Sequence, residues 1–392
     1  MTLPAKRLRI AVFNRVFSPT GGGAERYSIA LVEQLAARHE IHIFAQKIEH
    51  SWPGVTYHKV SAPLTRPRWL NLFWYATATW WATRLGFDVV HSHESTWHAQ
   101  VQTVHVLPMK YNLFHGRLGW KFAMRWLKVM TSPRLLAYLF MERMRFASRP
   151  SRCVVVTSPV LKDVMAQTYP GARLTVISPG VNLPSTTGNR TSARQQLNLP
   201  TQGRLLAFVA NDYQKKGLST LLQALALLPQ DVILAVVGNP IYIKDFRAKA
   251  QLLGLESRVY FLGHLPDVSP LYEAADVLAH PTTEDTFAMV VLEAMAHGLP
   301  VVVSAECYCG ISGLLTNGVN ALILSSPDNV QELADSLSTI IDDAALSQSL
   351  ANAARQFASG LSWPVLARQQ EAMYLQIASA KLNFRTSCPP TL

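Results

Sequence analysis

The 392-residue sequence lacks several features that would assign it to a common class of protein. No uninterrupted apolar run reaches about 18 residues, the length that predicts a membrane-spanning helix. The N-terminus has no long apolar run followed by a small-residue cleavage site, so we expect no secretory signal. The four cysteines fit neither a disulfide framework nor a paired zinc site. These absences predict a protein with reduced thiols in the cytoplasm.

The sequence also has few acidic residues, above all in its first half. The sequence contains no Asp-x-Asp motif, whose carboxylates would hold a metal ion against a diphosphate, so we expect neither a metal nor another cofactor. Residues 1–183 contain 23 lysines and arginines but 8 aspartates and glutamates, whereas the remainder is slightly acidic. This imbalance predicts an anionic partner for the first half, either a nucleic acid or an anionic membrane.

Short β-rich runs alternate with helical patterns in both halves of the sequence. In the first half, Arg9–Phe13 is predicted to be a strand and Ala24–Arg38 a helix. In the second half, Leu205–Val209 is predicted to be a strand and Leu218–Leu227 a helix. Further strands are predicted at Ile41–Phe44, Asp88–His91, Val232–Val237, Val277–His280 and Val301–Val303. This order predicts an α/β fold with two doubly wound parallel sheets.

A polar loop rich in turn-forming residues, near Pro184–Pro200, separates the two halves. We therefore predict two Rossmann-like domains that face a cleft. The N-terminal domain would comprise residues 1–183, and the C-terminal domain would comprise residues 184–364.

A basic and aromatic segment at residues 110–152 interrupts the alternation and contains a single acid. Four cations fall within an arc of about 80° on a helix that is otherwise nearly all apolar: Arg117, Lys121, Arg125 and Lys128. Such a helix suits an anionic lipid surface, where cations meet phosphates and aromatic side chains enter the acyl boundary. A core helix with a solvated basic stripe is the alternative. RNA binding is disfavoured because the segment contains no nucleic-acid motif.

Two loops that follow predicted strands carry groups suited to a phosphate. Gly22 and Gly23 lie in a glycine run that opens a helix, where backbone N–H groups can approach an anion; a plain tight turn is the alternative. The run does not match G-x-G-x-x-G, and no P-loop lysine follows it, which disfavours dinucleotide-binding and kinase functions. Lys215 and Lys216 lie between a strand and a helix, where a lysine can point at a diphosphate.

The stretch from Glu284 to Glu293 carries the strongest chemical signal. A strand ends near His280, a polar loop follows, and a helix then carries Glu293. Backbone N–H groups at the start of this helix could hold a phosphate or sugar hydroxyls. A carboxylate two turns into the helix can accept hydrogen bonds from two vicinal ribose hydroxyls. A capped helix with a surface glutamate is the alternative.

Together these features resemble glycosyltransferase family 4, whose members have the GT-B fold. The family signature is two carboxylates eight positions apart, here Asp285 and Glu293, followed by Ala-x-x-x-Gly-x-Pro. This sequence has Asp285 where Glu is usual, Ala288 where Gly is usual, and Asn211 where Arg is usual. The Lys-Lys-Gly loop and the segment Val268–His280 are similar to the subgroup that builds the lipopolysaccharide core.

The resemblance implies roles for residues of the C-terminal domain. Lys216, with Lys215 beside it, would bind the diphosphate, and Glu293 would bind the ribose. The side chain of Asp285, or of its neighbour Glu284, would contact the transferred sugar. The backbone of three further residues would hold the same sugar: Thr286, Phe287 and Ala288.

In the N-terminal domain, Gly22 and Gly23 would face the phosphates. His105 would contact the donor sugar near the reaction centre. His91 and His93 are interpreted first as structural residues at a strand end. The resemblance also implies that residues from about 365–392 form a helix that crosses back onto the N-terminal domain.

The resulting hypothesis is a retaining glycosyltransferase that moves a hexose from a nucleotide-diphosphate sugar to a membrane-associated glycolipid or polysaccharide such as the lipopolysaccharide core. The resemblance implies glucose from UDP-glucose, and GDP-mannose and other UDP-sugars stay open as donors. It would act in the cytoplasm, bound peripherally to the inner face of the cell membrane, and we expect no nucleic-acid partner. No enzyme nucleophile is evident, so the acceptor hydroxyl would attack from the same face that the leaving group departs. Two alternatives stay open: a soluble glycosyltransferase with a non-lipid acceptor, and a catalytically impaired nucleotide-sugar-binding protein.

Overall fold

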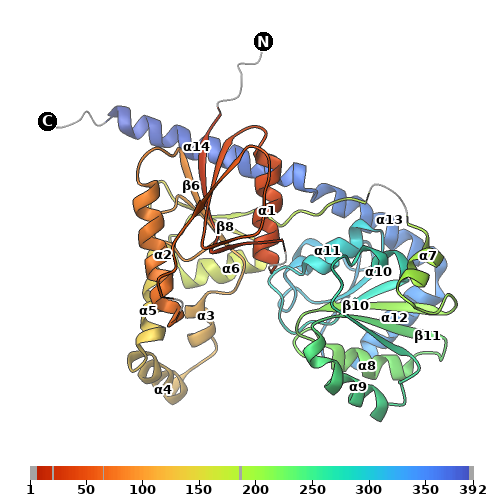
Figure 1. Cartoon of the computed structure of the whole chain (residues 1–392). Helices are drawn as coiled ribbons and strands as arrows, with labels where there is room; N and C mark the ends of the chain where they lie inside the picture. The colour runs from red at the N-terminus through yellow and green to blue at the C-terminus, as the bar shows by residue number, and fades with distance from the viewer. Residues whose placement is uncertain (1–6, 20–21, 65, 185–187, 388–392) are drawn as a thin grey trace. The chain divides into compact units, whose positions relative to one another are not determined.

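The computed structural model describes residues 7–19, 22–64, 66–184 and 188–387. The chain divides into two compact units, each an α/β structure (Figure 1). Unit 1 comprises Met1–Gly180 and Trp363–Leu392, and unit 2 comprises Val181–Ser362. The predicted α/β class with two parallel sheets is confirmed. Among the described residues, no helix combines the length and the apolar character needed to cross a membrane.

A seven-stranded parallel sheet lies at the centre of unit 1, in the order β5-β3-β1-β6-β7-β8-β9. Alternate residues of its strands enter opposite apolar layers. Ile10 and Val12 of β1 pack on one face, whereas Ala11 and Phe13 pack on the other. The strands are β1 (Arg9–Phe13), β3 (Glu40–Ala45), β5 (Val55–Lys59), β6 (Val89–Ser92), β7 (Val101–Val104), β8 (Cys153–Val156) and β9 (Leu174–Val176). A separate short pair consists of β2 (Val16–Phe17) and β4 (Lys47–Ile48).

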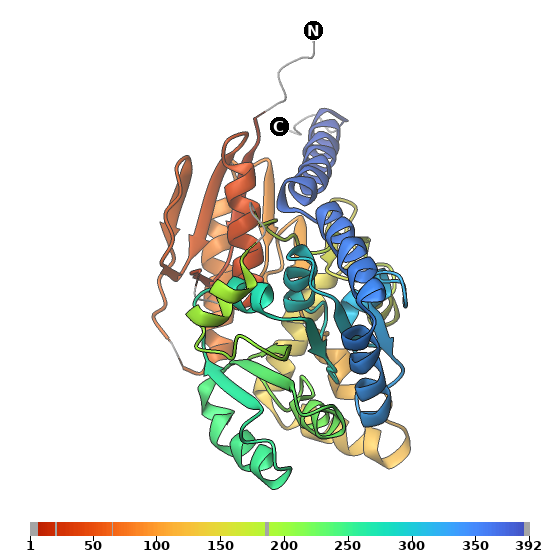
Figure 2. The same cartoon turned by 90° about the vertical axis from the view of Figure 1, so that its right-hand side faces the viewer.

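Helices cover both faces of this sheet. They are α1 (Gly23–Leu35), α2 (Arg68–Thr83), α3 (Met109–Phe114), α4 (Gly119–Met130), α5 (Pro133–Phe146), α6 (Pro159–Thr168) and α14 (Trp363–Ser387). The C-terminal helix α14 packs beside α1 and against β6, with Trp363 and Tyr374 in the same apolar layer as Ile10 (Figures 1 and 2). The predicted return of the C-terminal helix to the first unit is therefore confirmed.

Unit 2 has a six-stranded parallel sheet in the order β12-β11-β10-β13-β14-β15. Leu205 and Ala207 of β10 face one apolar layer, and Leu206 and Phe208 face the other, so helices again cover both sides. The strands are β10 (Arg204–Ala210), β11 (Val232–Gly238), β12 (Val259–Gly263), β13 (Val277–His280), β14 (Val301–Ser304) and β15 (Leu322–Leu324). The helices are α7 (Arg190–Gln196), α8 (Leu218–Leu227), α9 (Ile243–Leu252), α10 (Ser269–Ala274), α11 (Met289–Ala296), α12 (Val330–Asp342) and α13 (Ala344–Gly360).

The predicted loop over Pro184–Pro200 is wrong in its second half, because Arg190–Gln196 forms α7. Asn189 caps this helix by accepting a hydrogen bond from the Ser192 N–H group. The buried guanidinium of Arg194 then binds backbone carbonyls and Asp276, which fixes the short helix to the sheet. The polar composition of this segment did not predict that Arg194 would fix it as a helix.

Candidate functional site

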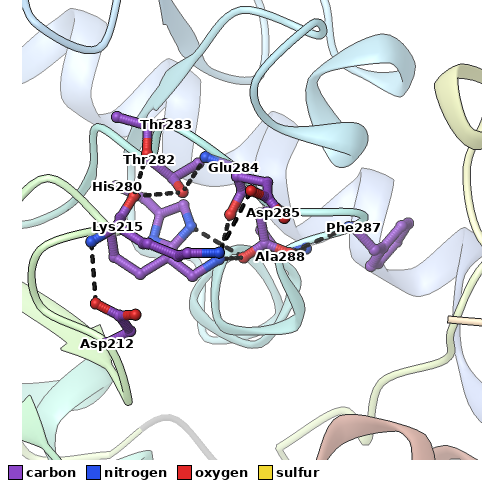
Figure 3. Close-up of polar contacts among 10 residues, drawn as sticks. Asp212, Lys215, His280, Thr282, Thr283, Glu284, Asp285, Phe287 and Ala288 are labelled. Carbon is purple, nitrogen blue, oxygen red and sulfur yellow. Dashed lines mark hydrogen bonds and ion pairs between the residues drawn. The ribbon is translucent and has the colours of Figure 1, made fainter. Parts of the chain in front are cut away.

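The lysine loop and the carboxylate loop of unit 2 follow the neighbouring strands β10 and β13, so they meet at the carboxyl edge of the sheet. Thr283 donates its backbone N–H to the Lys215 carbonyl at 2.9 Å, and its hydroxyl donates to the same oxygen at 3.0 Å (Figure 3). Gly217, at φ +81°, permits this approach, because a Cβ there would lie 1.9 Å from the Pro281 carbonyl oxygen. The glycine of the Lys-Lys-Gly motif is thus required by packing.

The two lysines of the loop have different partners. The Lys216 ammonium lies 2.6 Å from Asp285 Oδ2 and donates to the Glu284 carbonyl at 2.8 Å. Both side chains of the Lys216–Asp285 pair are about one-fifth exposed (20% and 18%). Lys215 instead forms a 3.4 Å ion pair with the Glu284 carboxylate, and both of those side chains are more than half exposed. The structure therefore distinguishes a shielded pair from a solvated one.

Asp285 also organises the turn that leads into α11. Its Oδ1 accepts hydrogen bonds from the Phe287 N–H at 3.2 Å and the Ala288 N–H at 2.8 Å (Figure 3). Ala288 takes a left-handed conformation, with φ +70°, at the N-cap of the helix. The side chains of Phe287 and Ala288 are buried in the apolar layer that contains α11. Both amides are thus already engaged within the protein, and Phe287 contributes packing.

The surroundings of Asp285 keep it ionised. Burial alone would raise the pKa of this carboxyl, but the hydrogen bond from His280 and the charge of Lys216 outweigh burial and lower it below its usual range. His280 ends β13 and is buried, with Nε2 at 3.4 Å from Asp285 Oδ2. Burial lowers the His280 pKa, against the raising effect of Asp285.

Sequence reasoning did not assign His280 to the site. The available signal was a histidine at the end of the apolar strand Val277–His280, next to the carboxylate loop. That signal is weak, because a histidine at a strand end is commonly a structural residue.

Glu293 lies on α11, as predicted, but about one turn from the start of the helix at Met289 and not two. Its Oε2 accepts a hydrogen bond from the Tyr272 hydroxyl of α10 at 3.0 Å. The two signature carboxylates therefore have separate surroundings. Asp285 pairs with a lysine in the loop, whereas Glu293 is oriented by a tyrosine on a neighbouring helix.

The glycine run of unit 1 stands at the start of α1, and Gly21 lies outside the described residues. Gly22 is the N-cap and has a negative φ of −74°, and its carbonyl accepts from the Arg26 N–H. A Cβ on Gly23 would meet no atom within 4 Å. Neither backbone strain nor packing among the described residues therefore explains Gly23, and the N-cap Gly22 supplies no side-chain cap to the first turn.

His105 follows β7 and pairs with His93, which follows the adjacent strand β6. His93 Nδ1 lies 3.1 Å from His105 Nε2, and the Tyr27 ring packs against both rings. His91 lies deeper, hydrogen-bonded to Tyr374 and Thr103, in accordance with a structural role. Burial, together with the nearby Arg145 charge, lowers the His105 pKa to about 3.

The basic segment forms three helices, and one part of the prediction is wrong. Arg117 lies in the turn before α4, at a bend formed by Gly116 and Gly119 with positive φ, so it is not on the helix with Lys121. Arg145 and Arg152 of the same segment are buried and donate to backbone carbonyls, so they hold the fold together instead of facing an anion.

Helix α4 itself has one buried residue, Val129, and does not match the alternative of a core helix. Its remaining apolar residues stand in solvent, with Trp120 68% exposed and Leu127 67% exposed. Lys121 and Lys128 are exposed on the same helix. In unit 1, α4 lies beside α5, which in turn contacts α2 through the stacked rings of Phe140 and Phe73 (Figure 1).

The predicted site residues thus fall into two sets. Unit 2 brings together Lys215, Lys216, Glu284, Asp285, Phe287 and Ala288, with Thr286 in the same loop and Glu293 on the following helix. Unit 1 holds Gly22 and Gly23 at α1 and His105 at β7.

Models of two protein families match the chain in succession. Residues 21–184 match the model described as Glycosyltransferase Family 4, and residues 189–357 match the model described as Glycosyl transferases group 1. The boundary between the two matches lies close to the boundary between the two structural units.

Curated relatives match over part of their length. The lipopolysaccharide glucosyltransferase WaaG of Escherichia coli (strain K12) is 30% identical over 236 residues, which are 56% of this chain and 61% of that protein. A D-inositol 3-phosphate glycosyltransferase of Corynebacterium diphtheriae is 30% identical over 214 residues, 51% of this chain and 49% of that protein. The matched region therefore spans about half to three-fifths of these relatives.

Solved structures extend the likeness to nearly the whole fold. A crystal structure of WaaG superposes with a TM-score of 0.77 and 23% identity, covering 92% of this chain and 98% of that one. Anabaena Alr3699/HepE, solved in complex with UDP-glucose, gives a TM-score of 0.71 and 22% identity, covering 94% of this chain and all of the other. At this level of identity the likeness concerns the fold.

Proposed function

Since the chain belongs to the family 4 glycosyltransferases with the GT-B fold, we propose that it transfers glucose from UDP-glucose to a lipid-linked acceptor with retention of anomeric configuration. The observation that carries this proposal is the shielded Lys216–Asp285 pair at the carboxyl edge of the unit 2 sheet. Ligands of open α/β sheets bind at that edge, and the pair supplies one group for phosphate and one for sugar hydroxyls.

Lys216 would stabilise the leaving UDP. In the free protein its charge is balanced by Asp285, at 2.6 Å. A diphosphate carries more negative charge than one carboxylate, so it would draw the ammonium toward the phosphate and release Asp285 to the sugar. Because the pair is four-fifths shielded from solvent, this charge acts more strongly on the leaving group than an exposed lysine would. No metal ion is needed in this scheme.

Retention would come from attack by the acceptor hydroxyl on the face that UDP leaves, with the departing phosphate taking the proton. Asp285 is a poor candidate for a covalent nucleophile, because its Oδ1 is engaged by two backbone amides and its Oδ2 by Lys216. Asp285 would instead hold hydroxyls of the sugar. A glycosyl-enzyme trapped on Asp285 or Glu284 would overturn this mechanism.

The choice of donor is supported by two relatives. WaaG is a lipopolysaccharide glucosyltransferase, and HepE was crystallised with UDP-glucose. Glu293, oriented by Tyr272, would bind the ribose of the nucleotide. A thermal-shift screen over UDP-glucose, other UDP-sugars and GDP-mannose tests the choice. At 100 times its Kd, the true donor stabilises the folded protein by about 2.7 kcal/mol.

The acceptor is proposed to be a glycolipid of the lipopolysaccharide-core type, reached from a membrane surface. Support comes from α4, whose exposed tryptophans and lysines suit an anionic lipid interface. The protein would act in the cytoplasm, held peripherally on the inner face of the cell membrane. The proposed membrane contact involves residues of unit 1 alone.

Lys216→Ala tests the proposed function most simply. Removing one preorganised charge from the leaving group is expected to lower kcat by about 10²–10³-fold. Lys244→Ala is the matched control, because Lys244 is an exposed lysine of the same unit on α9. Unchanged glucose transfer by a folded Lys216→Ala variant would refute the assignment.

A further inference from the structure

Asp285 presents its two carboxylate oxygens to different kinds of donor. Its Oδ1 accepts from the backbone N–H groups of Phe287 and Ala288, which lead into α11. Its Oδ2 is approached by two side chains, the Lys216 ammonium at 2.6 Å and the His280 Nε2 atom at 3.4 Å. The main chain therefore holds Oδ1, whereas the position of Oδ2 depends on a lysine and a histidine.

The two side chains at Oδ2 differ in their freedom to move. Lys216 has a flexible stem, and one-fifth of its side chain is exposed (20%). His280 is 1% exposed, and its backbone is fixed because β13 pairs with β14 up to and including this residue. Its ring points at the Asp285 carboxylate from the end of the strand (Figure 3). An anion can therefore draw Lys216 away from the carboxylate, whereas His280 stays behind it.

The surroundings of the His280 ring determine the position of its proton. Burial lowers the pKa of His280 and outweighs the raising effect of Asp285, so the ring is neutral at physiological pH and has one N–H group. Nδ1 is buried, and it has no hydrogen-bond partner within the described part of the chain. A proton there would be a buried donor without an acceptor, and the bare Nε2 atom would face a carboxylate. The proton therefore lies on Nε2, toward Asp285 Oδ2.

The hydrogen bond from His280 to Asp285 is stretched while Lys216 is in place. Its N···O distance of 3.4 Å exceeds the usual range of about 2.7–3.2 Å. The Lys216 ammonium lies closer to the same oxygen, at 2.6 Å, and also donates to the Glu284 carbonyl at 2.8 Å. A buried carboxylate that loses its closest donor gains by shortening the contact with the next one, since charge-assisted hydrogen bonds are the strong ones. Loss of Lys216 should therefore tighten the His280 contact.

We propose that His280 is a positioning residue for Asp285, which donates from Nε2 to Oδ2 and holds the carboxylate in place once an anion has drawn Lys216 away. His280 itself is too buried to touch a ligand. That the anion is the diphosphate of a nucleotide sugar rests on the proposed function; the pairing of His280 with Asp285 does not. In the donor complex, Oδ2 would then stay in position to accept a hydroxyl group of the sugar.

Nitrogen NMR of the full-length protein containing 15N-labelled histidine tests the pairing without any ligand. The His280 signals are assigned by their absence from a His280→Gln variant. At pH 7.5 we expect Nε2 to carry the proton. In Lys216→Met, which keeps the stem and loses the charge, the Nε2 proton is expected to move downfield because its hydrogen bond to Oδ2 shortens. A proton on Nδ1, or an unchanged signal in Lys216→Met, would overturn the proposal.

Lys215→Met is the matched control for this experiment. Lys215 belongs to the same loop but pairs with the Glu284 carboxylate and not with Asp285. Its substitution removes one positive charge and should leave the Nε2 proton of His280 unshifted. Equal shifts in the two lysine variants would report a general effect of charge and would count against the pairing of His280 with Asp285.

Two substitutions of His280 test its role in turnover. The side-chain amide of His280→Gln keeps a donor near the position of Nε2, whereas His280→Leu has a similar volume and no donor. We expect His280→Gln to keep most of kcat and His280→Leu to lower kcat about tenfold, the value of one hydrogen bond. The KM for UDP-glucose should change less than kcat, because Lys216 remains available to the diphosphate. Equal kcat values in the two folded variants would contradict the positioning role.

Titration with UDP separates this inference from the proposed function. UDP bound at Lys216 should move the Nε2 proton of His280 downfield in the wild-type protein, as Lys216→Met does. A shift in Lys216→Met without a shift on UDP binding refutes the proposed role of Lys216 and leaves the His280 pairing standing. An unshifted signal in Lys216→Met, in a protein whose wild type transfers glucose, refutes this inference alone.

Discussion

Lys215 and Lys216 are adjacent and chemically identical, yet the fold gives them different surroundings. Lys216 is shielded and pairs with Asp285 and the Glu284 carbonyl, whereas Lys215 is solvated. The family resemblance favoured Lys216 as the phosphate-binding lysine, but the residue types alone could not show how the two differ, because their difference depends on a loop 69 residues away. The surroundings of each lysine thus depend on which strands are adjacent in the sheet.

Ala288 carries a backbone cost that a glycine would remove. Its left-handed conformation, φ +70°, places an alanine Cβ where the family usually has no side chain. Ala288→Gly is expected to stabilise unit 2 by about 0.5–1 kcal/mol, because relief of strain exceeds the added entropy of the unfolded chain. Hydrogen exchange of β13 and α11 amides in denaturant measures the change.

Asn198 provides the matched control, since it also has a positive φ of 54° but is a residue type that tolerates this region. Asn198→Gly is expected to change stability by less than about 0.5 kcal/mol. If the two substitutions change stability equally, relief of backbone strain at Ala288 is not the cause of the stabilisation.

At the scale of elements, most of the strands that position the site were predictable. The runs at Arg9–Phe13 and Val277–His280 coincide with β1 and β13, because buried parallel strands are short, continuous apolar runs. Helix α8 also coincides with its prediction. The position of Arg117 was not predictable from periodicity, because two glycines with positive φ end one helix and start the next.

Helix α4 yields a prediction on membrane binding. Lys121→Glu is expected to weaken binding to anionic vesicles by about 1 kcal/mol for each unit of charge changed. Lys162→Glu on α6, an exposed lysine of the same unit, is the control and should have little effect. Flotation with anionic and neutral vesicles measures both. Equal partition of the wild-type protein to the two kinds of vesicle would exclude α4 as an anionic-lipid contact.

Helix α14 is joined to the histidines of unit 1 through Tyr374. Its buried hydroxyl lies 2.5 Å from His91 Nδ1. Tyr374→Phe would leave that nitrogen without its partner, and we expect a loss of about 1–3 kcal/mol in the free energy of unfolding of unit 1. Ser379→Ala on the exposed side of α14 should change it by less than about 0.5 kcal/mol. Urea unfolding followed by tryptophan fluorescence distinguishes these outcomes.

For the molecule as a whole, all 9 tryptophans belong to unit 1, so their fluorescence reports on that unit. This unit also buries neutral histidines. Burial lowers the pKa of His91 and of His105 to about 3, so between pH 6.5 and 3 the unfolded chain binds more protons than the folded one. Their contribution to stability is present above pH 6.5 and is lost as the pH falls.

We therefore expect unit 1 to lose stability between pH 6.5 and 5, by up to about 1.4 kcal/mol per pH unit for each such histidine. Urea unfolding at a series of pH values, followed by tryptophan fluorescence, measures this slope. His105→Gln should reduce the slope, because it removes one of the groups. A free energy of unfolding that stays constant over this range would show that the histidines are not buried as neutral rings.

The central claim is glucose transfer with retention, and its most direct test is the configuration of the product. The protein would be incubated with UDP-[13C]glucose and a lipopolysaccharide-core acceptor, and the anomeric carbon of the product would be followed by NMR. The account predicts an α-glucoside formed by the wild-type protein and its near absence with Lys216→Ala. A β-glucoside, or transfer that survives the loss of Lys216, would contradict it.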